Sequence, residues 1–204
     1  MRVSTLLFFS IFITTCSFSQ STSLTPYKIY FDNDLKNWTQ SFKNFKLEKF
    51  KISDTIKFER ISYDDTKNLK RFYALYKPAL SFSPDSSQFI DIYSYWLNLE
   101  RKGNKIVANV EVDQAVSFCD LKNNKWTRIF FCGYSTRIDE VLWIDNANFI
   151  LAGTFLDDKS LFHPQILIGN KTKKTLFVYT DSSIVATKMA YTSTKLKKLN
   201  IHDE

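Results

Sequence analysis

Two acidic residues, Glu111 and Asp113, come nearest to a catalytic pattern in this chain. They flank Val112, so an extended backbone would place both carboxylates on one face of a strand. Paired carboxylates serve glycoside hydrolysis, and calcium loops alternate several oxygen ligands. The sequence around Glu111 has no series of alternating oxygen-bearing side chains. The sequence therefore predicts solvated acids, and a small carboxylate-dependent hydrolase using Glu111 and Asp113 is the alternative.

Aromatic residues at 93–96 indicate a different chemistry, the binding of a ligand. In a strand predicted over 88–99, Tyr93 and Tyr95 would share one face, with Trp96 on the other. Exposed aromatic rings stack on sugar rings or contact protein partners. Packing between a sheet and a helix is the alternative role of these rings. The binding hypothesis requires Tyr93 and Tyr95 to be exposed, and it counts the three rings and the two acids above as candidate binding residues.

Other catalytic and cofactor patterns are missing from the sequence. His163 lies in a predicted loop and His202 in the C-terminal tail, and neither has a second histidine nearby for a zinc site. The adjacent acids at 139–140 and 157–158 are interpreted as solvated turn residues. The chain has 4 Gly, and no glycine-rich phosphate loop or Gly-x-Ser-x-Gly elbow is present. We therefore expect no catalytic residue, no metal site and no cofactor.

Cys119 and Cys132 lie in a predicted hairpin with its turn at 123–124. That register sets Cys119 opposite Arg128 and about 13 Å from Cys132 along the sheet. A disulfide needs Cα atoms within about 7 Å of each other. Two buried free thiols are therefore expected, whereas a bulge or a longer loop would allow a bridge.

The N-terminus has the pattern of a signal peptide. Arg2 supplies a positive charge, residues 6–13 are nearly all apolar, and small side chains precede a cleavage point after Ser19. Lipidation of Cys16 is the alternative, although Thr15 fits poorly before a lipidated cysteine. No later stretch approaches the ~20 apolar residues that span a bilayer. We expect a signal peptide over 1–19 and a periplasmic or secreted protein with no membrane span.

Basic residues outnumber acidic ones, 28 to 21, and the excess lies at both ends of the chain. Residues 20–77 and 161–204 are basic, whereas residues 78–160 are acidic. An exported protein rarely meets nucleic acid, so the basic segments would face anionic envelope polymers or lipid headgroups, or would be hydrated lysines without a partner. An envelope protein or polysaccharide is the expected partner, and nucleic acid is not.

The first part of the mature chain, residues 20–78, is predicted to be a helical cap. Its clearest helix has apolar residues at helical spacing, and Pro78 ends it; these residues are Leu69, Phe72, Tyr73 and Tyr76. A shorter helix is predicted after Asp34, and a strand over 55–62.

From residue 79 the pattern changes to short strands and tight turns. It predicts one four-stranded β unit over 79–132, a second over 138–180, and a C-terminal strand with a basic tail over 181–204. The two units resemble each other, and repeats of 40–50 residues are typical of propeller blades. Residues 20–204 are therefore expected to form a single domain.

The turn at Phe82-Ser83-Pro84-Asp85, followed by a polar pair and an apolar strand, resembles the WD40-like, TolB-type β-propeller repeat. In that family the Pro-Asp turn joins the two inner strands of a blade. The second unit, at residues 143–146, keeps the Asp and lacks the Pro. The run over 76–113 is also similar to small exported bacterial proteins of no known activity, which implies a shared fold and no chemistry.

The expected fold is α+β and mainly β. An N-terminal helical cap covers two propeller-blade-like, four-stranded antiparallel sheets, which form a partial propeller or a sandwich unless several chains complete a ring. Two units are too few for closure, because a propeller needs about four blades. The expected function is that of a non-catalytic exported module that binds protein or polysaccharide in the bacterial cell envelope.

Overall fold

The computed structural model describes residues 23–59, 62–63, 69–186 and 191–202. The predicted signal peptide and Cys16 lie outside these ranges. The helices are α1 (Lys28–Asp32), α2 (Lys36–Thr39), α3 (Leu69–Tyr76) and α4 (Thr194–Lys197), with 3-10 turns at Thr25–Tyr27, Leu47–Lys49 and Lys77–Ala79. None of the described helices is long and apolar enough to cross a membrane.

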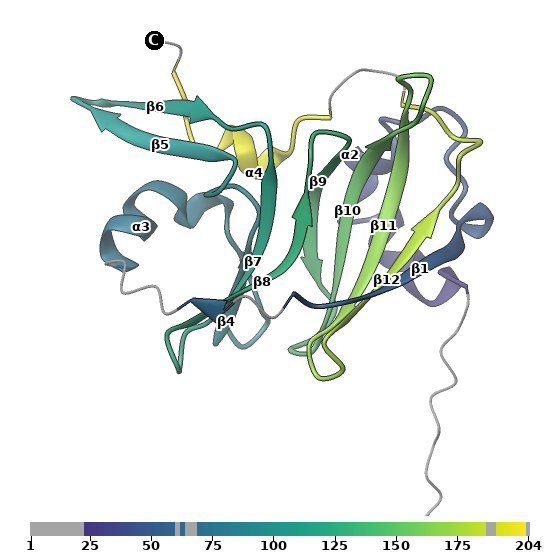
Figure 1. Ribbon diagram of the computed structural model, residues 1–204, viewed down its shortest axis with the longest axis horizontal. Helices are drawn as coiled ribbons and strands as arrows, with labels where there is room; N and C mark the ends of the chain where they lie inside the picture. The colour runs from purple at the N-terminus through teal and green to yellow at the C-terminus, as the bar shows by residue number, and fades with distance from the viewer. Residues whose placement is uncertain (1–22, 60–61, 64–68, 187–190, 203–204) are drawn as a thin grey trace, which may run out of the picture.

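Strands in antiparallel sheets are the commonest regular structure of the described chain. The strands are β1 (Lys51–Lys57), β2 (Ser62–Tyr63), β3 (Ser81–Phe82), β4 (Gln88–Asp91), β5 (Leu97–Lys102), β6 (Lys105–Val110), β7 (Gln114–Asp120), β8 (Lys125–Cys132), β9 (Thr136–Trp143), β10 (Asn148–Leu156), β11 (Phe162–Asn170) and β12 (Thr175–Thr180). The first sheet has the order β2-β8-β7-β4-β3 and the second sheet the order β1-β12-β11-β10-β9. Strands β5 and β6 form a separate hairpin, which projects from the body (Figure 1). The prediction of a mainly β chain is confirmed, and the described strands form no closed propeller.

Each five-stranded sheet contains the four strands of one predicted β unit. Its fifth strand comes from outside that unit. The extra strands, β1 and β2, come from the segment expected to be a helical cap. Each lies at one edge of its sheet, β1 beside β12 and β2 beside β8. The predicted strand over 55–62 begins earlier, at Lys51, and ends at Lys57. Strand β1 therefore borders the second sheet, and β2 borders the first.

The two faces of the second sheet bury apolar side chains against different partners, because successive strand residues point to opposite faces. Phe149 and Leu151 pack in the same cluster as Phe89 of the first sheet. Ile150 packs in a second cluster with Trp38 of α2. A strand buried on both faces needs an almost continuous apolar run, and β10 has one.

Helix α3 covers the outer face of the first sheet. The ring centroids of Phe72 and Phe89 lie 6.1 Å apart, and those of Phe72 and Trp126 lie 5.1 Å apart. The Tyr76 hydroxyl donates to the carbonyl oxygen of Leu97 at 2.7 Å and accepts from the amide of Leu99 at 2.9 Å. The predicted aromatic stripe is thus a core face that also fixes the β5–β6 hairpin.

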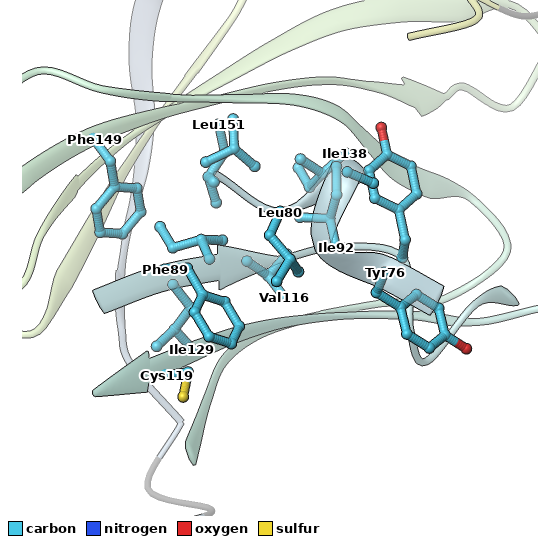
Figure 2. Packing of buried hydrophobic residues seen from close by; sticks show 14 of the residues in the cluster. Tyr76, Leu80, Phe89, Ile92, Val116, Cys119, Ile129, Ile138, Phe149 and Leu151 are labelled. Atoms are coloured by element: carbon cyan, nitrogen blue, oxygen red, sulfur yellow. The ribbon is translucent and has the colours of Figure 1, made fainter. Parts of the chain in front are cut away.

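The molecule is layered, with helices on both outer sides of the pair of sheets (Figure 1). Helix α3 lies outside the first sheet, the two sheets pack against each other, and α1 and α2 lie against the far face of the second sheet. Figure 2 shows the interior, where Val116 and Ile129 of the first sheet, Leu80 and Tyr76 gather in one cluster with Phe149.

Cys119 and Cys132 are buried and form no disulfide, as expected. The predicted register is wrong, because Asp120 pairs with Lys125 and four residues form the turn. Cys119 therefore opposes Trp126 and not Arg128. Burial raises the pKa of the Cys132 thiol to about 12.

The C-terminal segment differs from its predicted strand and tail. Within the described residues the strand is reduced to one antiparallel bridge, between Phe42 and Ala186, and residues 187–190 lie outside the described ranges. The basic tail forms α4, whose first turn is capped by the Ser193 hydroxyl accepting from the Lys195 amide at 3.1 Å.

Candidate functional site

A hollow of about 250 Å³ opens beside Asp139 on β9, and we call it the Asp139 pocket. Hydrogen-bonding side chains make up one part of its wall: Ser41, Gln114, Ser135, Thr136, Arg137, Asp139 and Thr154. Aromatic side chains make up another part: Phe42, Trp96, Tyr134, Phe162 and Tyr191. The pocket thus joins the N-terminal segment, the second sheet and the connections that follow β4, β6 and β8.

A β-bulge in β9 positions Asp139. Glu140 pairs with Ala152 and Ile138 pairs with Gly153, so Asp139 is the extra residue between them. Gly153 makes this close approach possible, because a Cβ atom there would lie 2.0 Å from the carbonyl oxygen of Arg137. Bulges of this kind redirect side chains and are frequent beside functional sites.

The Asp139 carboxylate is buried, and the groups around it only partly compensate its negative charge. Burial raises its pKa to about 7, against the lowering influence of Arg137 and of a hydrogen bond from Trp38. The Trp38 indole N–H donates to Oδ2 at 3.3 Å. Arg137 Nε lies 3.2 Å from Oδ1, but its N–H does not point at a hydrogen-bond acceptor. A carboxyl group in this state changes its charge near neutral pH.

The Arg137 guanidinium also covers an aromatic ring of the pocket. Its central carbon lies 4.4 Å from the centroid of the Trp96 ring, in a cation–π contact. About a third of the Arg137 side chain is exposed, at 32%. Because guanidinium nitrogens present several donors in a rigid fork, Arg137 can donate to a ligand while it stays against Trp96.

A partly buried polar network extends inward from Tyr191 in the pocket wall. The Tyr191 hydroxyl donates to Glu140 Oε1 at 2.9 Å, and the Tyr93 hydroxyl donates to the backbone oxygen of Asp139 at 3.4 Å. Burial raises the pKa of both tyrosines. Lys195 from α4 donates to the carbonyl oxygen of Val141 at 2.8 Å, and burial lowers the pKa of its ammonium group. These contacts fix the strand that carries Asp139.

Gln114 makes a second rigid support for the pocket. Its amide nitrogen donates to the carbonyl oxygens of Ile92 and Ile138, each at 2.9 Å, and its amide oxygen accepts from the Ile138 N–H at 2.7 Å. All three bonds are buried. They tie the connection after β4, which carries Trp96, to β9, which carries Arg137 and Asp139.

The mouth of the pocket exposes two large apolar side chains. Tyr134 is 79% exposed and Val112 is 77% exposed, and these are the highest values among the exposed large apolar residues that the structure describes. Both line the Asp139 pocket. Exposed apolar side chains gathered at a concave site mark a place where a ligand or partner binds.

The aromatic residues at 93–96 do not form the exposed strand face that the sequence predicts. The predicted strand ends at Asp91, whose Oδ1 accepts from the amides of Tyr93 and Ser94 at 2.9 and 3.1 Å and turns the chain. Tyr93 is buried, which contradicts the exposure that the hypothesis required. Tyr95 is exposed and packs its ring edge-on against Phe131, outside the pocket. Trp96 lines the pocket.

The predicted acids do not share a strand face. Strand β6 ends at Val110 and β7 begins at Gln114, so Glu111 and Asp113 lie in the connection between them. Glu111 is exposed and Asp113 is half-buried. Neither acid lines the Asp139 pocket, although Val112, which lies between them in the sequence, does.

His163 is also placed differently from its prediction. It lies in β11, is buried, and is bonded through both ring nitrogens: Nδ1 lies 2.7 Å from the carbonyl oxygen of Ile184, and Nε2 lies 2.8 Å from Asp157 Oδ2. Its ring stacks on Phe155 at 5.3 Å. His163 therefore fixes the loop before β11 and supports Phe162 in the pocket wall.

Within the described ranges, no group of three or more His, Cys, Asp or Glu side chains is arranged to hold a metal ion. In comparisons with known proteins, the chain matches no family model, no curated protein and no solved structure. The resemblance of the turn at 82–85 to the WD40-like repeat therefore stays a prediction. The assignment of a function depends on the geometry of the Asp139 pocket alone.

Proposed function

We propose that this protein is an exported, non-catalytic module that binds a saccharide of the bacterial cell envelope in the Asp139 pocket. The observation that carries the proposal is the exposure of Tyr134 and Val112 at the mouth of a hollow with polar walls. Export is supported by the signal-peptide pattern over 1–19.

The chemistry of the walls fits a sugar ring. A sugar presents apolar C–H faces and equatorial hydroxyls, so it is bound by aromatic rings together with donors and acceptors. Trp96 and Tyr134 supply rings, Arg137 supplies donors, and Asp139 supplies acceptors. The volume of about 250 Å³ is below the ~300–1,000 Å³ of pockets for drug-sized ligands, and it suits a single sugar unit.

The same walls favour binding over hydrolysis. Glycoside hydrolysis by the common routes uses two carboxylates that flank the bond. Asp139 is the one carboxylate among the described residues that line the pocket, since Glu111 and Asp113 lie outside it.

Glycan binding by the purified protein tests this proposal. Envelope glycans and their fragments are screened for retention, and the affinity of a retained fragment is measured by calorimetry. Tyr134→Ala should weaken binding about three- to tenfold, because an aromatic contact contributes about 0.5–1.5 kcal/mol. Tyr95→Ala, which removes an exposed ring outside the pocket, is the matched control and should change the affinity less than about twofold. Retention of no glycan, or equal losses in the two variants, would contradict the proposal.

A further inference from the structure

Five lysines surround a second hollow, at the other end of β11 from the Asp139 pocket. This hollow of about 630 Å³ is lined by Lys57, Lys125, Lys171, Lys173 and Lys174, and we call it the lysine hollow. The lysines come from the end of β1, the start of β8 and the turn between β11 and β12. Segments far apart in the sequence thus bring positive charges together beside the turn between β11 and β12 (Figure 1).

The charge of the lysine hollow is only partly offset by nearby acids, because Asp85 and Asp120 attract Lys171 from a distance without forming an ion pair. Glu59 is the one carboxylate in the described lining, and it is engaged in an ion pair with Arg128. None of the five lysines forms an ion pair with a described carboxylate. Four of them are exposed, and Lys171 is held in place by donating to Gln88 Oε1 at 2.5 Å. Like charges brought together repel, so an anion bound here would be stabilised.

The arrangement fits a chain of anionic groups better than a single phosphate. Lysines act as separate point charges on flexible stems, whereas bidentate recognition of one phosphate uses arginine. No arginine lines the described part of the hollow. Lys57, Lys125 and Lys173 come from three different strands or turns, so they can contact successive charges along a polymer.

The floor of the lysine hollow argues for a glycan over nucleic acid or membrane. Sites for single-stranded nucleic acid use free aromatic faces for stacking, but the Phe58 ring is packed at 6.3 Å from Phe149 and the Lys171 ammonium lies 5.6 Å above Phe118. Insertion into a membrane requires protruding apolar side chains. Phe58 and Phe118 are half-buried and Ile129 is fully buried, so the apolar part of the floor is recessed.

We propose that the lysine hollow binds an anionic polysaccharide, a polymer bearing carboxylate or sulfate groups. This site is separate from the Asp139 pocket, and its occupancy does not depend on the saccharide proposed there. The binding free energy is electrostatic and comes largely from the release of counterions, so it falls as the salt concentration rises.

A heparin oligosaccharide tests the proposal as a defined anionic glycan. Its affinity for the purified protein is measured at several NaCl concentrations. The variant Lys57→Gln/Lys125→Gln/Lys173→Gln should bind at least about tenfold more weakly at low salt, and its slope of log affinity against log salt should be shallower by about 2, at ~0.7 per lost contact. The matched control is Lys36→Gln/Lys43→Gln/Lys49→Gln, which removes the same charge from exposed lysines elsewhere.

The control variant should retain the affinity within about twofold and the slope of the unmodified protein. Equal losses in both triple variants would show attraction to net charge alone and would overturn the proposal. Tighter binding of an oligothymidylate, or of vesicles containing phosphatidylglycerol, than of the heparin oligosaccharide would overturn it as well. Circular dichroism of both variants confirms that the comparison is made between folded proteins. The Tyr134→Ala variant should bind heparin normally, which separates failure of this site from failure of the Asp139 pocket.

Discussion

Replacing Asp139 by asparagine should stabilise the protein at alkaline pH. The carboxyl group has a pKa of about 7 in the folded protein, because burial disfavours its charged form, whereas in the unfolded chain its pKa is near 4. The folded state therefore holds the proton more tightly. Stability from this group is fully present below about pH 4 and is lost progressively as the pH rises to about 7 and above.

The size of the effect follows from the difference between the two pKa values. Each pKa unit corresponds to about 1.4 kcal/mol, so three units correspond to about 4 kcal/mol. About 3 kcal/mol of this falls between pH 5 and pH 9. The groups facing the carboxyl group are Arg137 and Trp38, which favour its charge, and Glu140, which opposes it. An asparagine side chain in its place cannot ionise, and its amide oxygen can still accept the Trp38 hydrogen bond.

Urea denaturation from pH 5 to pH 9 measures this prediction. The free energy of unfolding of the unmodified protein should fall relative to that of Asp139→Asn as the pH rises. Asp145→Asn is the matched control in the same hairpin. Although its partial burial raises the pKa of Asp145, hydrogen bonds from Asn148 and the Ala147 amide lower it overall, so this variant should lose stability at neutral pH. Parallel pH profiles for the unmodified protein and Asp139→Asn would refute the account of Asp139.

Three further predictions concern the packing that supports the pocket. Gly153→Ala should lower the free energy of unfolding by at least ~3 kcal/mol in thermal denaturation, because its Cβ would meet the backbone at 2.0 Å. Gly103→Ala should lower it by only about 1 kcal/mol, because of the positive φ at that position. Equal losses in the two variants would contradict the bulge. Cys119 and Cys132 should both resist iodoacetamide in the folded protein and both react in denaturant, and a thiol count of zero in denaturant would contradict the absence of a disulfide. His163→Ala should lower the free energy of unfolding by about 2–4 kcal/mol, since it removes one buried hydrogen bond, one partly buried hydrogen bond and a stacked ring, and an unchanged denaturation midpoint would exclude that role.

The sequence predicts the strands well where the apolar pattern is local. The strands from β7 to β12, the aromatic stripe of α3 and the mainly β character all follow from spacing and turn residues, although the register of β7 with β8 does not. The place of β1 in the second sheet could not be predicted in the same way, because β1 is largely exposed and pairs with β12, more than a hundred residues later. Long-range pairing leaves little trace in a local pattern.

The candidate site was harder to predict than the fold. Asp139 and Glu140 look like turn acids, since two adjacent charges seldom lie inside a buried strand. The available signal was Gly153, an isolated glycine in an apolar strand, which is typical of a bulge or a close backbone approach. Tyr93, Tyr95 and Trp96 were assigned by strict alternation, and the Asp91 turn breaks that alternation.

The position of β1 sets an order on the folding of the chain. Lys51 pairs with Thr180, so the second sheet gains β1 as an edge strand only after β12 has been synthesised. Until then the strand has no partner, and the pairing must close a loop of more than a hundred residues. Such non-local contacts are formed slowly. The chain should therefore remain incompletely folded while it is made, and a truncation before β12 should leave the second sheet without its closing edge.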